Sequence, residues 1–239
     1  MKKVCCFIVA MQGEAKPLIR HFGLHHIEGC FGSLPPQAYR ASYAGKEIFL
    51  VTNGIEQETG LDYIGCEAAV LSAHLAVSSF SPDLIINAGT AGGFVSKGAE
   101  IGDVYLSNKY VVFHDRRVPI PGWDKMGQGY LPCVDPLNII SEINAKSGVC
   151  TSGSSLDITG DDLEQMKQTG GEVKDMEAGA VAWVASLYNI PLLCVKAITD
   201  LVDAGHSTPE QFNDNFLLAT QRLDDVCFRL IDEKLVDKL

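Results

Sequence analysis

Three short, almost entirely apolar runs constrain the fold of this chain more than any other feature of its sequence. They occupy residues 4–10, 84–86 and 191–199, and segments with helical spacing lie between them. A strand that is covered on both faces has a continuous apolar run, and such strands are typical of sheets in α/β proteins. The chain therefore predicts an α/β fold in which helices cover a largely buried sheet.

The segments between these runs extend the same alternation. Further strands are expected as a hairpin over 38–43 and 47–52, as one strand or a bent pair over 102–113, and near 148–151. Helices are expected over 14–22, 60–80, 161–168 and 177–187, from about 136, and from Pro209 to the end with Thr208 as a cap. No linker, repeat or low-complexity tract interrupts the chain, so residues 1–239 are expected to form a single domain.

The acidic balance of the chain limits the partners that it can bind. Its formal net charge is −11, from 30 acidic side chains against 19 lysines and arginines. Such a surface repels the phosphates of nucleic acids and of anionic membranes, so we expect neither as a partner. No stretch approaches the ~20 apolar residues of a membrane span, and the run that follows residues 1–3 is expected to be a strand rather than a signal peptide.

The cysteines and histidines are scattered along the chain. There are eight cysteines and six histidines, without CxxC or HExxH spacing. Dispersed thiols among apolar neighbours indicate buried cysteines in a reducing compartment, so we expect a cytoplasmic protein without a metal site. The glycine-rich segment 89–93 has neither the GxGxxG pattern nor that of a Walker loop, so no nucleotide cofactor is expected.

Polar groups follow the predicted strands at the places where a ligand would bind. In open α/β sheets ligands lie beyond the carboxyl ends of strands. Glu14, a glycine-rich turn at 89–93 and Asp200 each follow an apolar run, and Glu177 begins a helix. Each also has an ordinary explanation, because carboxylates are common in the first turn of a helix and in turns after strands. Spacing alone leaves both interpretations open.

The residues of these segments are more specific than their spacing. Residues 9–14, 87–93, 174–182 and 196–200 contain, in that order, VAMQGE, NAGTAGG, KDMEAGAVA and KAITD. Together they resemble the 5'-methylthioadenosine/S-adenosylhomocysteine nucleosidases of the nucleoside phosphorylase superfamily, and 113–121 and 199–203 resemble its plant-type branch. The resemblance covers nearly the whole chain. It implies a single domain whose central twisted mixed β-sheet is flanked by helices.

The resemblance implies a role for each of three carboxyl groups. Asp200 would give a proton to N7 of the adenine, which requires a buried, protonated acid. Glu14 would be the general base that activates the attacking water. Glu177 would accept hydrogen bonds from the ribose hydroxyls, and its place at a helix start would keep it ionised. The implied reaction is hydrolysis of the N-glycosidic bond of 5'-methylthioadenosine to adenine and the thioribose, in methionine salvage.

Further substrate contacts are implied by the same resemblance. Met176 would lie against the sugar, and Thr90 would lie near the reacting water in the glycine-rich segment that also holds Gly92. Leu156 would pack on the adenine where bacterial members stack an aromatic ring. The backbone of Asp157 would meet the edge of the adenine.

Two more positions belong to this set, and a third bears on specificity. Thr199 would support Asp200, and Lys196 stands where bacterial members have an arginine. Pro209 stands where bacterial members place an aromatic residue over the 5' group. A narrower 5' pocket is therefore expected, with 5'-methylthioadenosine preferred over S-adenosylhomocysteine.

The family forms homodimers in which a loop of one subunit walls the pocket of the other. The candidate is the long irregular segment 114–132, which is rich in proline and glycine. Val118, Ile120 and Pro121 would be the apolar contacts of this partner loop.

Two other functions are weighed against hydrolysis. A phosphorylase needs cationic donors for phosphate, but Asn87 stands where related bacterial-type phosphorylases have an arginine, and Glu14 would repel the anion. A nucleoside-binding protein without catalysis should lack one of the three carboxylates, and all three are present. Hydrolysis is the preferred interpretation.

Overall fold

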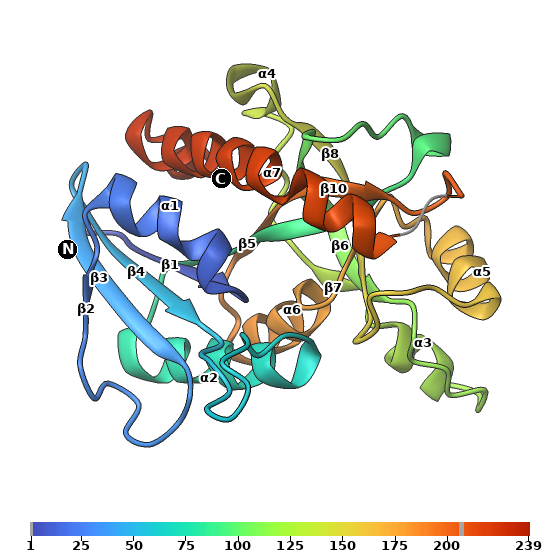
Figure 1. Ribbon diagram of the computed structural model, residues 1–239, viewed down its shortest axis with the longest axis horizontal. Coiled ribbons are helices and arrows are strands. Elements are labelled where there is room, and N and C mark those ends of the chain that lie inside the picture. The colour runs from blue at the N-terminus through green and yellow to red at the C-terminus, as the bar shows by residue number, and fades with distance from the viewer. Residues whose placement is uncertain (1, 206–207) are drawn as a thin grey trace.

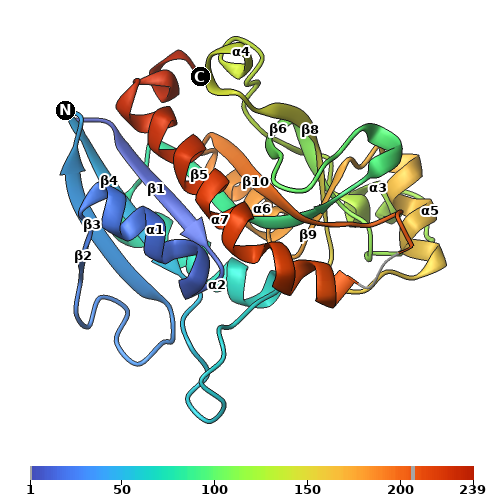
Figure 2. The same ribbon diagram turned by 45° about the horizontal axis from the view of Figure 1, so that its top comes forward.

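Helices cover both faces of a mixed sheet in the computed structural model, which describes residues 2–205 and 208–239 (Figure 1). Helices α1 (Gln12–Phe22) and α7 (Thr208–Asp232) lie on one face, while α2 (Cys66–Phe80) and α6 (Ala178–Tyr188) lie on the other. Figure 2 shows α7 running along the sheet over β5 and β10. The predicted α/β class is confirmed.

The sheet has ten strands, and part of it closes on itself. Its order is β10-β6-β8-β9-β5-β1-β4-β3-β2, and β7 pairs with β6. Because β10 also pairs with β5, the strands β5, β10, β6, β8 and β9 form a closed ring. The strand bounds are β1 Val4–Val9, β2 His25–His26, β3 Gln37–Tyr43, β4 Lys46–Thr52, β5 Leu84–Gly93, β6 Val104–Phe113, β7 Leu131–Pro132, β8 Lys146–Ser152, β9 Val173–Asp175 and β10 Leu192–Leu201.

The first strand shows why its run is apolar throughout. Successive side chains of a strand point to opposite faces. Phe7 and Val9 pack in the core under α1 and α7, and Cys6 and Ile8 pack in the core under α2 and α6. Both faces of β1 are therefore buried, which confirms the interpretation of its sequence.

The two long helices that cover the sheet bury themselves in different ways. On α7, Leu223, Cys227 and Leu230 recur on one face and are fully buried. Helix α6 consists largely of small residues, so it can approach the sheet closely. A Cβ atom on Gly179 would lie 2.6 Å from the ring of Phe113, and this contact excludes a side chain there.

Several predicted helix boundaries are corrected. Helix α2 begins at Cys66 rather than near residue 60, because Gly65 has φ 93° and residues before it form a bridge between Ile55 and Asp62. Helix α4 (Ile140–Ile143) is one turn, and α5 (Gly160–Thr169) is close to its predicted bounds. Thr208 is the first described residue of α7, and the residue before it lies outside the described residues, so its role as a cap stays a prediction.

Some elements carry no periodic signal and were not predicted. These are the short strands β2, β7 and β9, the helix α3 (Trp123–Gln128), and the 3₁₀ turns η1 (Val95–Lys97) and η2 (Leu235–Lys238). The predicted strand over 102–113 is one strand, β6, and it is bent. Its register with β8 shifts between Ser107 and Val111, where Lys109 has φ 61°.

The end of the described chain packs against its beginning. Lys3 Nζ donates to the carbonyl oxygen of Val236 at 2.7 Å, and Lys46 pairs with Asp237 at 2.7 Å. Within the described residues, no helix is both long and apolar enough to cross a membrane.

Candidate active site

Strand β5 changes neighbours along its length, and the candidate site lies where this happens. Its first half lies between β1 and β10, and its last two residues pair with β9 instead of β1. The chain leaves the sheet after β1 to enter α1 and after β9 to enter α6. The starts of these two helices, where Glu14 and Glu177 lie, therefore meet beside β5. This is the kind of divergence at which α/β sheets bind ligands.

A cavity of about 160 Å³ opens at this point. The structure brings together in its wall most of the residues that the sequence predicted, namely Glu14, Thr90, Gly92, Leu156, Met176, Glu177, Thr199 and Asp200. The remaining lining residues were not predicted as contacts: Ala10, Met11, Ile64, Ala91, Lys174, Asp175 and Phe212.

Glu14 is buried in the first turn of α1 and held by three donors. The backbone N–H and the hydroxyl of Thr90 donate to its Oε1 at 2.6 and 2.8 Å, and the N–H of Met11 donates to its Oε2 at 3.2 Å. Burial raises the pKa of Glu14, while the bonds from Thr90 and the charge of Lys196 oppose this rise. A fixed carboxylate with a raised pKa suits a general base.

Asp200 lies inside β10 rather than after it, opposite Gly92 of β5. Thr199 Oγ1 donates to its Oδ1 at 2.8 Å. Burial raises the pKa of Asp200, and the bond from Thr199 and the charge of Lys174 lower it in part. Partial desolvation thus moves this carboxyl group toward the protonated form that an acid needs.

Glu177 is the residue just before α6, and its carboxylate accepts the N–H of Gly65 at 2.8 Å. Burial, followed by the nearby charge of Asp175, raises its pKa to about 7, against the smaller effect of Lys196. The helix start alone therefore does not keep Glu177 fully ionised near neutral pH. Desolvation outweighs the helix dipole, whose effect is typically under 1 kcal/mol at exposed sites.

A buried ion pair lies beneath these carboxylates. Lys196 Nζ is 2.7 Å from Asp175 Oδ2, and their side chains are 1% and 0% exposed. Asp175 also accepts the N–H groups of Glu177 and Ala178, so the pair fixes the segment that carries Glu177. Lys196 does not line the cavity, and its predicted contact with substrate is corrected to a place beneath the wall.

The glycine-rich segment 89–93 is strand rather than turn. It forms the last half of β5, in register with β10. Its small residues reflect close packing: a Cβ atom on Gly92 would lie 2.7 Å from Asp200 Oδ2 and 2.8 Å from Val202. Gly92 thus makes room for the carboxyl group of Asp200.

The structure leaves other predicted contacts outside the cavity wall. Asp157 is exposed and is not among the lining residues, although Leu156 beside it is. Val118, Ile120 and Pro121 also lie away from this cavity in their own subunit. Within the described residues, no group of three or more histidine, cysteine, aspartate or glutamate side chains is arranged to hold a metal ion.

The sequence did not indicate the other lining residues, and the reasons can be identified. Ile64 lies in the segment that was assigned to α2, and Lys174 and Asp175 lie on β9, a strand of three residues. Met11 and Phe212 had a usable signal, because Met11 lies just before α1 in the turn after β1 and Phe212 lies in the first turns of α7.

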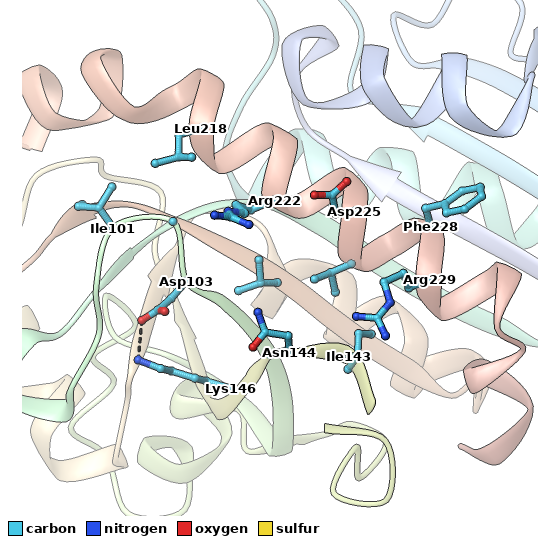
Figure 3. Close-up of a pocket in the computed structure, with 14 residues that line it drawn as sticks. Ile101, Asp103, Ile143, Asn144, Lys146, Leu218, Arg222, Asp225, Phe228 and Arg229 are labelled. Carbon is cyan, nitrogen blue, oxygen red and sulfur yellow. Dashed lines mark hydrogen bonds and ion pairs between the residues drawn. The ribbon is translucent and has the colours of Figure 1, made fainter. Parts of the chain in front are cut away.

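A larger cavity of about 500 Å³ lies elsewhere, between α7 and the beginnings of β6 and β8 (Figure 3). Its walls include Lys146 and Asp103, which pair with each other at 2.6 Å, and also Arg222, Asp225 and Arg229. None of the buried carboxylates described above faces it. Charge and burial, rather than size, therefore single out the smaller cavity.

Comparison with known proteins agrees with this fold. The family model of the Phosphorylase superfamily matches residues 5–232, and the chain belongs to this superfamily. The chain is 39% identical over 230 residues to the 5'-methylthioadenosine/S-adenosylhomocysteine nucleosidase of Arabidopsis thaliana, covering 95% of this chain and 89% of that protein. It is 40% identical over 228 residues to the 5'-methylthioadenosine nucleosidase of Arabidopsis thaliana, covering 95% and 85%.

A solved structure gives the same result in three dimensions. The Arabidopsis thaliana 5'-methylthioadenosine nucleosidase in its apo form superposes with a TM-score of 0.93 at 39% identity, covering 97% of this chain and 95% of that one. The resemblance drawn from the sequence, including its plant-type character, is confirmed.

The raised pKa of Glu177 predicts a pH-dependent stability. Its pKa is about 7 in the folded state against 4.5 when unperturbed, so its contribution is fully present below pH 4.5 and is lost as the pH rises through 7. The glutamine side chain of the Glu177→Gln variant cannot ionise, so this variant does not lose stability as the pH rises through 7. In urea unfolding of the free protein it should be more stable than wild type by about 1–3 kcal/mol at pH 8, with the difference vanishing near pH 4.5.

The exposed Glu164 on α5 provides a matched control. Glu164→Gln should change the free energy of unfolding equally at both pH values. A pH-independent effect of Glu177→Gln would contradict the raised pKa.

Proposed function

We propose that this chain hydrolyses the N-glycosidic bond of 5'-methylthioadenosine, releasing adenine and the thioribose, and that it belongs to methionine salvage. Membership of the Phosphorylase superfamily and the two Arabidopsis relatives support this activity. The observation that carries the proposal is one small cavity lined by Glu14, Glu177 and Asp200, each with a raised pKa.

The proposed mechanism divides the chemistry among these three groups. Cleavage of a glycosidic bond passes through an oxocarbenium-like state, so the leaving base needs a proton and the sugar needs a nucleophile. Asp200 would protonate N7 of the adenine as the bond to the sugar breaks. Glu14 would take a proton from the attacking water, and Glu177 would accept hydrogen bonds from the ribose hydroxyls. Buried negative charge would also stabilise the cationic sugar.

Water is the proposed nucleophile because the wall offers little to bind phosphate. No arginine lies among the described residues that line the cavity, and its single cation, Lys174, already donates to two carbonyl oxygens. Asn87 is directed away and donates to the carbonyl of Ile8 at 3.1 Å. A phosphate beside Glu14 would meet a carboxylate instead of the several donors it requires.

An adenine-release assay tests this proposal. With 5'-methylthioadenosine, wild type should release adenine at the same rate with and without inorganic phosphate. Glu14→Gln and Asp200→Asn should each lower kcat by about 10²–10⁴, because each removes a general acid or base. Glu164→Gln should retain full activity. Strict dependence on phosphate would make the enzyme a phosphorylase, and full activity of both site variants would contradict the mechanism.

The proposed preference for 5'-methylthioadenosine rests on the apolar end of the cavity. Met11, Ile64 and Phe212 supply apolar contacts, whereas S-adenosylhomocysteine ends in a charged amino acid group that is costly to bury without partners. We expect kcat/KM for 5'-methylthioadenosine to exceed that for S-adenosylhomocysteine by about tenfold or more, equivalent to ~1.4 kcal/mol. Equal values of kcat/KM would contradict the preference.

The chain is also proposed to act as a homodimer in the cytoplasm. The segment that carries Val118, Ile120 and Pro121 exposes Ile120, Trp123 and Met126, which are 56%, 57% and 64% exposed. Exposed apolar clusters of this kind mark interfaces between proteins. All eight cysteines are free thiols, as expected in a reducing compartment.

Sedimentation tests the dimer. Wild type should have twice the mass of one chain, while Ile120→Asp should shift the equilibrium toward monomer and raise KM for 5'-methylthioadenosine, because the pocket loses its partner wall. Leu217→Asp changes a leucine on α7 that is even more exposed, at 69%, and should leave the mass unchanged. A monomeric wild type would refute this proposal.

A further inference from the structure

Lys174 is a buried cation in the cavity wall that the proposed chemistry does not use. It is 6% exposed, and its Nζ donates to the carbonyl oxygens of Ser155 and Leu156, both at 2.8 Å. A buried ammonium without such partners would be strongly destabilising. The lysine is therefore held in place, and it holds in turn the segment that carries Leu156.

The pairing of three strands places this lysine in one row with the proposed acid. Asp200 of β10 is the register partner of Gly92 of β5, and Gly92 is the register partner of Lys174 of β9. Register partners in a sheet project from the same face. Because the middle position is a glycine, no side chain separates Lys174 from Asp200 across the row.

Successive side chains of β9 point to opposite faces of the sheet, so Lys174 points away from the side chains of Val173 and Asp175. Val173 is part of the core under α2 and α6, and Asp175 bonds to the start of α6 at the edge of the cavity, whereas the side chain of Lys174 points to the opposite face of the strand and lines the cavity. One strand of three residues thus contributes to the core, to the buried ion pair and to the cavity wall.

The segment that Lys174 holds forms part of the wall of the cavity that Asp200 also lines. Leu156 is 39% exposed and lines the cavity, and the residue before it is also exposed. Just upstream, the N–H of Ser154 donates to Asp115 at 3.0 Å, which fixes the beginning of the segment. The two bonds from Lys174 fix the carbonyl groups that follow.

We propose that Lys174 is a positioning residue, which holds the Ser155–Leu156 wall of the base pocket and places its charge in one row with Asp200 across Gly92. This inference rests on the proposed function, in which the base of the nucleoside lies between that wall and Asp200. Lys174 acts through these two elements and takes no part in bond breaking.

The charges around Lys174 and Asp200 agree with this role. Burial lowers the pKa of Lys174, while four carboxylates oppose that change: Asp200 on β10, Asp175 on β9, Asp162 on α5 and Asp157 in the loop before it. From α7, the uncharged Gln211 and Asn215 contact the backbone beside Asp200.

The effect on the acid has a defined sign. Burial raises the pKa of Asp200, and the charge of Lys174 lowers it. Glu14 and Glu177 line the same cavity as Asp200. The lysine therefore keeps the proton of Asp200 available for transfer rather than permanently bound.

Lys174→Met tests the proposal because it keeps the bulk of the side chain and removes both the charge and the donors. The basic limb of the pH profile of kcat/KM should move to higher pH by roughly 0.5–1 unit, since Asp200 would keep its proton longer. KM for 5'-methylthioadenosine and the Kd for adenine, measured by calorimetry, should each rise about tenfold. Lys174→Arg keeps the cation and should restore the position of the limb.

Lys146→Met is the matched control. Lys146 also holds a backbone carbonyl group, because its Nζ donates to the carbonyl oxygen of Gly98 at 2.7 Å. It lines the separate cavity of Figure 3. Its loss should leave the pH profile, KM and adenine affinity unchanged. Lys174→Gln replaces the charged group by a neutral amide. If Lys174→Met does not fold, it provides the same test of the basic limb of the pH profile.

The outcomes separate this inference from the proposed function. An unmoved basic limb together with unchanged KM and adenine affinity in folded Lys174 variants would overturn the role of Lys174, whatever the wild-type activity. A wild type that releases no adenine would overturn the proposed function instead. In that case the Kd for adenine of the Lys174 variants, compared with that of wild type, still decides whether Lys174 holds a base pocket.

Discussion

The hydrogen bonding of β5 is the constraint on which the rest of the structure depends. This strand pairs with β1 and β10 along its first half and with β10 and β9 at its end. The exchange of β1 for β9 brings chain segments that are far apart in the sequence to one place. It also closes five strands into a ring, which fixes β10 against β5 over the length that carries Asp200.

The site concentrates buried charge, and its two lysines balance it differently. Asp175 is neutralised by Lys196 at 2.7 Å beneath the wall, while Lys174 contacts carbonyl oxygens at the surface of the cavity. Glu14, Glu177 and Asp200 are left without a direct ion pair among the described residues. Isolated buried carboxylates are costly for folding. Such a cost is retained where a cationic transition state can repay it through preorganised electrostatics.

The sequence predicted the layers of the fold because strands buried on both faces have continuous apolar runs. The spacing of the three carboxyl groups left their function open, and the resemblance of the segments that contain them assigned their roles. The sequence could not reveal β9, because three residues have no periodicity, and so Lys174 was missed as a part of the wall. The glycines of 89–93 predict a turn because glycine is common in turns, but here the small size of Gly92 makes room for the carboxyl group of Asp200 within β5.

The closed ring has a consequence for how these molecules can associate. A sheet with free edges can grow by adding strands from another chain, which leads to aggregation. On the side of the ring the outer strand is β7, which has two residues, and the opposite border is β2, which also has two residues, His25 and His26. Short strands thus stand at both borders of the sheet, which limits continuous strand pairing between copies and favours helices and loops as the surfaces for assembly.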